Sequence, residues 1–562
     1  TGNRITCRDW FQLCLKEGLT VFRDQQFSGD MRGHAVKRID DVRMLRASQF
    51  REDAGPLAHP VRPESYFEIN NFYTATVYEK GAEVIRMLKT LVGDEGYAKA
   101  LDLYFERHDG QACTIEDWLT VFEDACGEDL SQFKLWYSQS GTPILNVSEG
   151  WDADAGIFTL TVRQHTEPTP NQPVKQPLRM DVRFTLLDGD GSVIPDVGER
   201  KLFIDKAEHV VPVHNLKGMA TKPILSFNRN FAAPVIVEHK QTRDERLILF
   251  AHDTDAFNRW EAGRGLAKDQ LMDMIVQDAA PDQAYLDALG TMLGNDALDP
   301  AFRAFSLGLP SEDDLAQSLH KGGRTPDPER IHDCREALLN AIAQAHGAQF
   351  AQLYDAMKVP GPYRPDAADA GRRALRLAAL DALSRTEGTA RATALFAETD
   401  NMTERLGALA ALLRHGDGTA ESQRFFETWK ADPNVLDKWF ALQISCASPE
   451  AAHDRANALT EHADFNWKTP NRFRAVIGAF VGNTAGFHAA DGTGYDFVAH
   501  WLGKLDPVNP MTAARMATVF ETWERYDGDR QGQMRDAVRR LLDGTPSRDM
   551  TEIATRILGE PG

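Results

Sequence analysis

The chain contains 562 residues with a formal net charge of −20, and 42% of its residues are hydrophobic and 26% charged. This length exceeds what a single hydrophobic core supports, so we expect two to four domains. The negative charge, with no Lys/Arg-rich run to offset it, argues against a nucleic-acid partner, which would require a positive surface against the phosphates. The sequence also lacks an apolar run of membrane-spanning length and a signal-peptide core, so we expect no membrane partner.

The six cysteines stand apart in the sequence, with no Cys-x-x-Cys pair and no paired framework. This usage is typical of a reducing compartment and favours a cytoplasmic protein. The sequence opens TGNRITCRDW, with neither an initiator Met nor the composition of a tail. We interpret this start as a position inside a domain.

Residues 1–142 are predicted to be mainly helical. Apolar residues recur at helical spacing in YEKGAEVIRMLKTLVG and GYAKALDLYFERHDG. Thr114 and Asp117, at the start of TIEDWLTVFEDA, match a capping box with Asp in place of the usual Glu. Gly141 and Pro143 then end the helical pattern.

Residues 143–245 change from a helical period to the period of two that is typical of strands. FTLTVRQ and MDVRFTLL alternate apolar and polar positions, and the turn-forming DGDG follows the second of them. About one hundred residues of short strands and Pro/Gly-rich turns predict a small β-sandwich.

Residues 246–562 are predicted to form a large helical domain, because Ala- and Leu-rich segments such as RRALRLAALDALSR and TERLGALAALLRHG fill it. The alternatives are stacked helix pairs, as in HEAT or ARM solenoids, and one compact helical domain. No strict repeat is visible, so we favour an irregular array of helix pairs.

A carboxylate interrupts the first apolar helix, WFQLCLKEGLTVFRD. Trp10, Leu13 and Cys14 recur at helical spacing, and this spacing places Glu17 on or beside the inward face. A buried carboxylate requires a cation, a metal ion or a set of hydrogen-bond donors, because an unpaired buried charge costs several kcal/mol. Taken alone, Glu17 would be a helix-end carboxylate that pairs with a Lys or Arg.

Three sequence blocks carry a family resemblance. KEGLTVFRD, NNFYTATVYEKGAEVIRML and WYSQSGTP together resemble the zinc aminopeptidases of the aminopeptidase N family, particularly the bacterial alanyl type. NRFRAVIGAF and FHAADGTGYDF resemble the terminal domain of the bacterial enzymes. The resemblance implies a mainly α, multidomain protein: the C-terminal part of a thermolysin-like (gluzincin) catalytic domain, a β-sandwich and a helical C-terminal domain.

The resemblance also implies roles for residues of a zinc site. Glu17 matches the third zinc ligand, which Lys16 would help to order, and Tyr78 matches the tyrosine that donates a hydrogen bond to the oxyanion. The family spacing places the second histidine of the H-E-x-x-H motif three residues before Thr1, so both histidine ligands and the general base are missing from this sequence. We therefore expect a parent enzyme that uses one Zn²⁺ to hydrolyse N-terminal residues from peptides, and an inactive isolated chain.

Further positions match the substrate site of the family. Asn70, Tyr73 and Glu79 are expected to line or order the substrate pocket, and Arg474 and Arg515 to meet the C-terminal part of a peptide. Without the resemblance, the tyrosines would be ordinary core residues and the arginines solvated or ion-paired helix residues. We expect a monomer, with a preference for Ala or other small to medium first residues.

A second hypothesis from another class remains open at this point. The sandwich and the helical array could belong to a non-catalytic protein that binds peptides or proteins, with the first segment purely structural. Epoxide hydrolysis on the same scaffold is less expected, because the helical domain has the length of the bacterial type.

Overall fold

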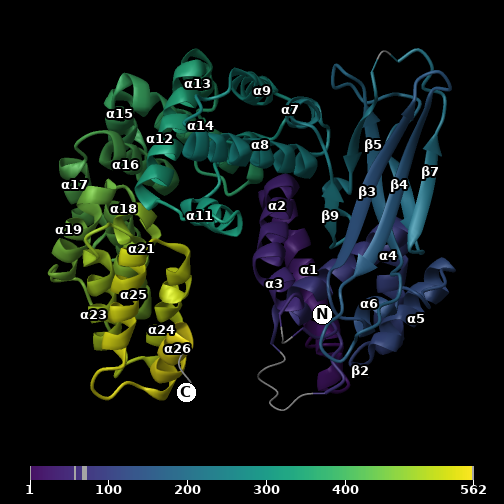
Figure 1. Cartoon of the computed structure of the whole chain (residues 1–562), viewed down its shortest axis with the longest axis horizontal. Coiled ribbons are helices and arrows are strands. Elements are labelled where there is room, and N and C mark those ends of the chain that lie inside the picture. The colour runs from purple at the N-terminus through teal and green to yellow at the C-terminus, as the bar shows by residue number, and fades with distance from the viewer. Residues whose placement is uncertain (1, 56–57, 66–72, 220, 560–562) are drawn as a thin grey trace. The chain divides into compact units, whose positions relative to one another are not determined.

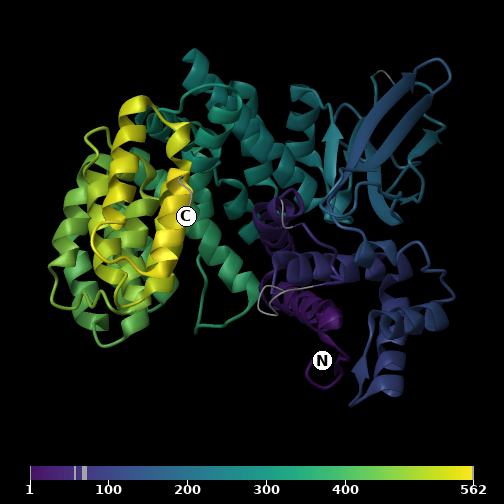
Figure 2. The ribbon, with the colours of Figure 1, turned by 60° about the horizontal axis from the view of Figure 1, so that its bottom comes forward.

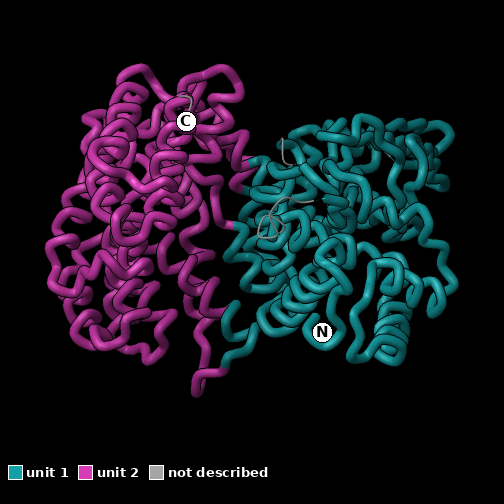
Figure 3. Tube along the Cα trace, turned by 90° about the horizontal axis from the view of Figure 1, so that it is seen from below, with its two compact units in different colours: residues 1–266, 287–306, 365–371 teal, residues 267–286, 307–364, 372–562 magenta. Residues whose placement is uncertain are grey.

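A computed structural model describes residues 2–55, 58–65, 73–219 and 221–559. The chain divides into two compact units, shown in different colours in Figure 3. The first comprises Thr1–Leu266, Asp287–Ser306 and Pro365–Gly371, and the second comprises Ala267–Leu286, Leu307–Arg364 and Arg372–Gly562.

The first unit begins with helices and short turns, as the sequence predicts (Figure 1). These elements are β1 Thr6–Cys7, η1 Trp10–Gln12, α1 Leu13–Arg32, α2 His34–Met44, η2 Leu45–Gln49, α3 Phe50–Asp53, η4 Thr76–Lys80, α4 Gly81–His108, β2 Ala112–Cys113, α5 Ile115–Cys126 and α6 Leu135–Ser138. The predicted capping box is present at the start of α5, where the side chain and backbone of Thr114 bond with Asp117 in both directions. Local sequence signals therefore explain where this helix begins.

Two local details refine the sequence interpretation. The expectation that Trp10 lies on the inward face of α1 is wrong: Trp10 is 47% exposed, because it belongs to the 3-10 turn η1 before the helix begins. Leu13 and Cys14 are buried as expected. Helix α4 is broken at Gly93, whose φ of 76° lies in the region that favours glycine, and this break separates the two helical segments seen in the sequence.

A β-sandwich follows, with sheet orders β7-β4-β3-β9 and β6-β5-β8 (Figure 1). The strands are β3 Pro143–Asp152, β4 Ile157–Thr166, β5 Met180–Leu187, β6 Arg200–Ile204, β7 Glu208–Val213, β8 Ile224–Phe227 and β9 Ile236–His239, with the 3-10 turn η5 Arg229–Phe231 between the last two. The alternating apolar residues of β4 are fully buried, as the period of two predicts.

The sandwich and the helices before it share one hydrophobic core. The same buried cluster contains Trp118 and Trp136 from the helices and Phe158 and Phe184 from the two sheets. The indole Nε1 of Trp136 donates a hydrogen bond of 2.7 Å to the carbonyl oxygen of Arg179, just before β5. Burial of large aromatic side chains thus joins two segments that the sequence presents as separate folds.

After β9 the described residues form helices and no strand. They are α7 Arg243–His252, α8 Ala256–Gln277, α9 Gln283–Gly294, α10 Pro300–Ser306, α11 Glu312–Lys321, α12 Pro328–Ala345, α13 Gly347–Ala356, α14 Ala367–Glu387, α15 Ala390–Glu398, α16 Met402–His415, α17 Thr419–Trp429, α18 Pro433–Ser445, α19 Pro449–Thr460, α20 Pro470–Phe473, η6 Arg474–Gly478, α21 Ala479–Gly482, α22 Thr484–Phe487, α23 Thr493–Leu505, α24 Pro510–Ala517, η7 Thr518–Arg525, α25 Gly528–Leu541 and α26 Arg548–Leu558.

The short breaks between these helices have local causes. Side-chain caps such as Asp327, Asp432 and Asp527 accept hydrogen bonds from the first turns of α12, α18 and α25. Helices close in sequence pack against one another, and Figure 2 shows the last ones side by side in yellow. Among the helices in the described ranges, none is both long and apolar enough to cross a bilayer.

Candidate active site

The site begins with a close crossing of α1 and α4. Gly18 and Gly81 face each other there, and a Cβ atom built on Gly18 would lie 2.9 Å from the carbonyl carbon of Gly81. A Cβ on Gly81 would lie 3.3 Å from the Cα of Gly18. The two backbones are therefore in contact, which only glycine permits at such a crossing. This contact brings Glu17, next to Gly18, beside Tyr78, three residues before Gly81.

Glu17 and Tyr78 interact directly. Burial, then the charge of Glu17 and a hydrogen bond to it, raise the pKa of Tyr78 to about 12. Tyr73 adds a smaller contribution, with its ring centroid 6.3 Å from that of Tyr78. The phenol therefore keeps its proton at neutral pH and can act as a hydrogen-bond donor.

Glu17 also has a cationic neighbour. The Nζ atom of Lys16 lies 3.4 Å from Oε1 of Glu17, and the two side chains are 31% and 15% exposed. Among the described residues the carboxylate thus has one cationic neighbour and one hydroxyl donor. The arrangement fits a Lys16 that orders the carboxylate of Glu17, and it equally contains the ordinary ion pair that Glu17 alone would predict.

Tyr78 sits on η4, a π-helical turn that is held at its N-terminal end. The backbone N–H of Thr76 donates to Oε1 of Glu52 over 2.9 Å, and the amide of Gln49 donates to the Thr76 hydroxyl over 3.2 Å. Burial opposes ionisation of Glu52, but hydrogen bonds from His59 and Thr76 outweigh it and lower its pKa to about 2. Such π-turns occur frequently at functional sites.

The C-terminal end of η4 is held by a buried ion pair. Nζ of Lys80 lies 2.8 Å from Oδ2 of Asp53 and also donates to the carbonyl oxygen of Gly141 over 2.9 Å. Burial acts to raise the pKa of Asp53, but the charge and hydrogen bond of Lys80 lower it overall. These positioning residues could not be predicted from the sequence: the acidic pair in QFRED was a visible signal, but its partners are distant in sequence.

The expected substrate residues are only partly described. Tyr73, Tyr78 and Glu79 line an open pocket of about 290 Å³. Burial, followed by the charges of Asp41 and other carboxylates, raises the pKa of Glu79. Asn70 lies outside the described residues.

Arg474 and Arg515 belong to the second unit, whereas Glu17 and Tyr78 belong to the first. Both arginines are exposed. Arg474 begins the π-helical turn η6, and a Cβ on Gly478 would lie within 4 Å of both the Cβ of Arg474 and the Cε of Met516. The two arginines therefore lie on neighbouring elements of the second unit.

The described residues do not form a complete zinc site. No group of three or more His, Cys, Asp or Glu that could hold a metal ion occurs among them. A catalytic zinc site in proteins has three protein ligands. Glu17 fits one of these positions, and its described neighbours, Lys16 and Tyr78, cannot supply the other two.

Sequence families match the chain in three successive segments. "Peptidase family M1 domain" matches residues 1–137, and "Domain of unknown function (DUF3458) Ig-like fold" matches residues 141–240. "Domain of unknown function (DUF3458_C) ARM repeats" matches residues 243–559. These matches confirm the predicted fold class, including its order of catalytic segment, sandwich and helical array.

Known proteins match the chain over nearly its full length. It is 46% identical to Aminopeptidase N of Caulobacter vibrioides, covering 100% of this chain and 65% of that protein. It is 40% identical to Aminopeptidase N of Escherichia coli, covering 96% and 63%. A crystal structure of Legionella pneumophila aminopeptidase A in complex with aspartic acid matches with a TM-score of 0.77 and 28% identity, covering 99% of this chain and 64% of that one. The chain thus spans slightly less than two thirds of these relatives.

Proposed function

Because the chain belongs to the aminopeptidase N family of M1 peptidases, we propose that it carries the C-terminal portion of a zinc aminopeptidase that removes N-terminal residues from peptides. The observation that carries the proposal is the contact between Glu17 and Tyr78 at the crossing of α1 and α4. A non-catalytic binding protein is not favoured, because the relatives are named aminopeptidases.

In this proposal each residue of the first unit has one role. Glu17 is one zinc ligand, with two imidazoles supplied from outside these 562 residues, and Lys16 orders its carboxylate. Tyr78 donates a hydrogen bond to the carbonyl oxygen of the scissile peptide as that oxygen becomes negative. Asn70 and Tyr73 line the substrate pocket, and Glu79 orders its polar groups. The raised pKa of Tyr78 supports its role, because only the neutral phenol carries the O–H that donates.

Substitutions in the full-length protein test these roles. We expect Tyr78→Phe to lower kcat about 100- to 1000-fold with zinc still bound, as for other lost oxyanion donors. Tyr363→Phe, at a 64% exposed tyrosine of the second unit, is the matched control and should leave kcat unchanged. Glu17→Ala should lose zinc and activity together. Normal zinc content in Glu17→Ala, or unchanged turnover in Tyr78→Phe, would contradict the assignment.

The isolated chain provides a separate test. With one zinc ligand it should hydrolyse no amino-acid arylamide even when zinc is added. Turnover that a chelator abolishes would mean that the metal site lies elsewhere in these residues.

Arg474 and Arg515 are proposed to bind the C-terminal part of a peptide. Their support is that both are exposed and that, within the described ranges, neither side chain has a hydrogen bond or ion pair. Replacing both by Gln should raise KM for tripeptides and longer substrates and leave KM for arylamides unchanged. An equal change of KM for peptides and arylamides would contradict the assignment of the two arginines to the substrate site.

We extend the proposal to a cytoplasmic monomer that acts in peptide catabolism and prefers small to medium first residues such as Ala. All six cysteines are free thiols, which supports a reducing compartment. The monomeric state can be tested by size-exclusion chromatography with light scattering. Cell fractionation tests the cytoplasmic location, and a panel of arylamides tests the preferred first residue.

A further inference from the structure

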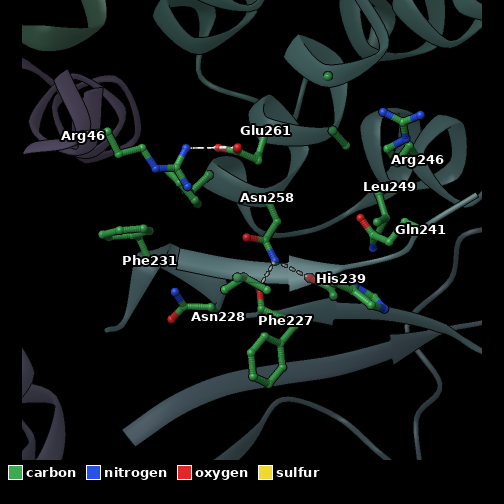
Figure 4. Close-up of a pocket in the computed structure, with 15 residues that line it drawn as sticks. Arg46, Phe227, Asn228, Phe231, His239, Gln241, Arg246, Leu249, Asn258 and Glu261 are labelled. Carbon is green, nitrogen blue, oxygen red and sulfur yellow. Dashed lines mark hydrogen bonds and ion pairs between the residues drawn. The ribbon is translucent and has the colours of Figure 1, made fainter. Parts of the chain in front are cut away.

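Two cavities in the first unit differ in the charge of the residues that line them. The first, shown in Figure 4, has a volume of about 270 Å³ and lies between the end of the sandwich and α7 and α8. Its Arg46 pairs with Glu261, and the amide of Asn258 donates to the hydroxyl of Ser226 and the carbonyl oxygen of Phe227. This ion pair and these hydrogen bonds join lining residues to one another, as is typical of packing between structural elements.

The second cavity, here called the basic pocket, has a different charge. It has a volume of about 220 Å³, many times the roughly 10–15 Å³ that one water needs. Residues of α1, α4, β5, β6 and η5 line it, and five of them are cations: Arg86, Lys89, Arg183, Lys201 and Arg229. Asp94 is the one carboxylate in the described lining, and its side chain is 89% exposed. A concentration of positive charge in a chain of net charge −20 requires an explanation.

Arg86 is a largely buried cation of the pocket that lacks a close carboxylate partner. Its Nη2 atom donates to the amide oxygen of Gln25 over 2.8 Å, but its buried Nε atom has no hydrogen-bond partner among the described residues. The nearest described carboxylate oxygen, on Glu83, is 3.7 Å away. Glu83 is already bound by Arg38 through two hydrogen bonds of 2.6 and 2.7 Å. Burial, then the neighbouring charge of Arg38, lower the pKa of Arg86 to about 10. An anion in the pocket would relieve both effects.

The outer cations are available to a ligand. Lys201 is exposed, and its one hydrogen bond to the described residues goes to the carbonyl oxygen of Thr90, over 3.1 Å. Arg183 is 36% exposed and has a long contact of 3.4 Å with Glu199. Two lining cations already have a carboxylate partner: Nζ of Lys89 lies 3.0 Å from Oδ1 of the exposed Asp94, and Asp253 and Glu199 neutralise Arg229.

The backbone of the pocket leaves free space at one edge. Gly93 has a positive φ, and a Cβ there would contact nothing within 4 Å, so its requirement for glycine is conformational and the space beside it is free. Asn230, which also lines the pocket, has a positive φ of 56°, a conformation that asparagine adopts more readily than most residues.

We propose that the basic pocket binds a small multivalent oxyanion, either phosphate or the phosphate or clustered carboxylate groups of a larger ligand. Arginine and lysine side chains at the border of a cavity are the groups that bind such anions, and arginine does so through paired N–H donors. Arg86 forms the inner wall of the site, and Lys89, Arg183 and Lys201 surround its opening.

Isothermal titration of the 562-residue chain with pyrophosphate, inorganic phosphate and citrate tests this inference. Ionic strength is matched with sodium chloride, because surface charges bind anions nonspecifically at low salt. We expect one-to-one binding of pyrophosphate, and a loss of about 10- to 100-fold in affinity for each cation removed. Arg183→Gln/Lys201→Gln is the test variant, since both side chains are exposed enough to be changed without loss of the fold.

Arg163→Gln/Lys206→Gln is the matched control. It removes the same two charges from exposed positions of the same sandwich, outside the pocket. Equal thermal midpoints of the two variants show that both are folded. Pyrophosphate binding without citrate binding identifies a phosphate-bearing ligand, and binding of both supports recognition of clustered charge. No binding of any of the three anions, or equal weakening in both variants, overturns the proposal.

Discussion

The buried pair of Lys80 and Asp53 should be the most sensitive point of the candidate site. Their side chains are 2% and 1% exposed and lie 2.8 Å apart. Among the described residues, Lys80→Met would leave the buried Asp53 carboxylate with only the side chains of Thr142 and Gln49 as hydrogen-bond donors, and with no cation. Removing one partner of a buried pair typically costs about 3–5 kcal/mol, because the remaining charge is uncompensated.

Hydrogen exchange of the 562-residue chain measures this cost where it arises. We expect peptides that cover residues 76–92 to lose about 3–5 kcal/mol of protection, since η4 and the start of α4 lose their anchor. Lys430→Met is the control, because the pair of Lys430 and Glu427 is about half exposed, at 51% and 52%. Exposed pairs contribute about 0–1 kcal/mol.

A double variant separates the unpaired charge from the lost contact. Lys80→Met/Asp53→Leu should recover most of the protection, because neither charge remains buried. If Lys80→Met costs no more than Lys430→Met, or if the double variant is as weak as the single one, the pair does not hold η4 in place.

Two further predictions concern packing and pH. The Gly18→Ala variant should be about 1–3 kcal/mol less stable than the control variant Gly503→Ala, whose added Cβ would have nothing within 4 Å. Both substitutions raise helix propensity, but only the Cβ at position 18 meets the backbone of another helix. Equal free energies of unfolding in denaturant would refute the close crossing. Burial, then the charges of Arg530 and Arg525, lower the pKa of His488 to about 3. As pH falls, this histidine therefore takes up a proton in the unfolded chain before it does so in the folded one. The free energy of unfolding should decrease by up to about 1.4 kcal/mol per pH unit between about pH 6.5 and pH 3. A His488→Gln variant whose thermal midpoint keeps the same pH slope would assign that slope to other groups.

The order and type of the elements could be predicted from the sequence, because the signals that determine them are local. The capping box of Thr114 and Asp117 acts within one helical turn, and the alternation in β4 follows from the pleat of a strand. In β5 the sequence alternates, but seven of its eight residues are buried. Glu17 and Tyr78 could be selected through a family resemblance. Trp10 shows the limit of this method, since helical spacing alone does not reveal where a helix begins.

Tertiary structure alone decided which distant residues meet. The contact of Gly18 with Gly81, the pair of Lys80 with Asp53 and the five cations of the basic pocket join positions on different elements. Periodicity shows which face of an element is apolar, but not which element covers it, because that choice depends on the packing of the whole core. For this reason the sequence indicated the candidate residues of the site, whereas the residues that hold Tyr78 in place and the charge of the second cavity emerged only from the folded chain.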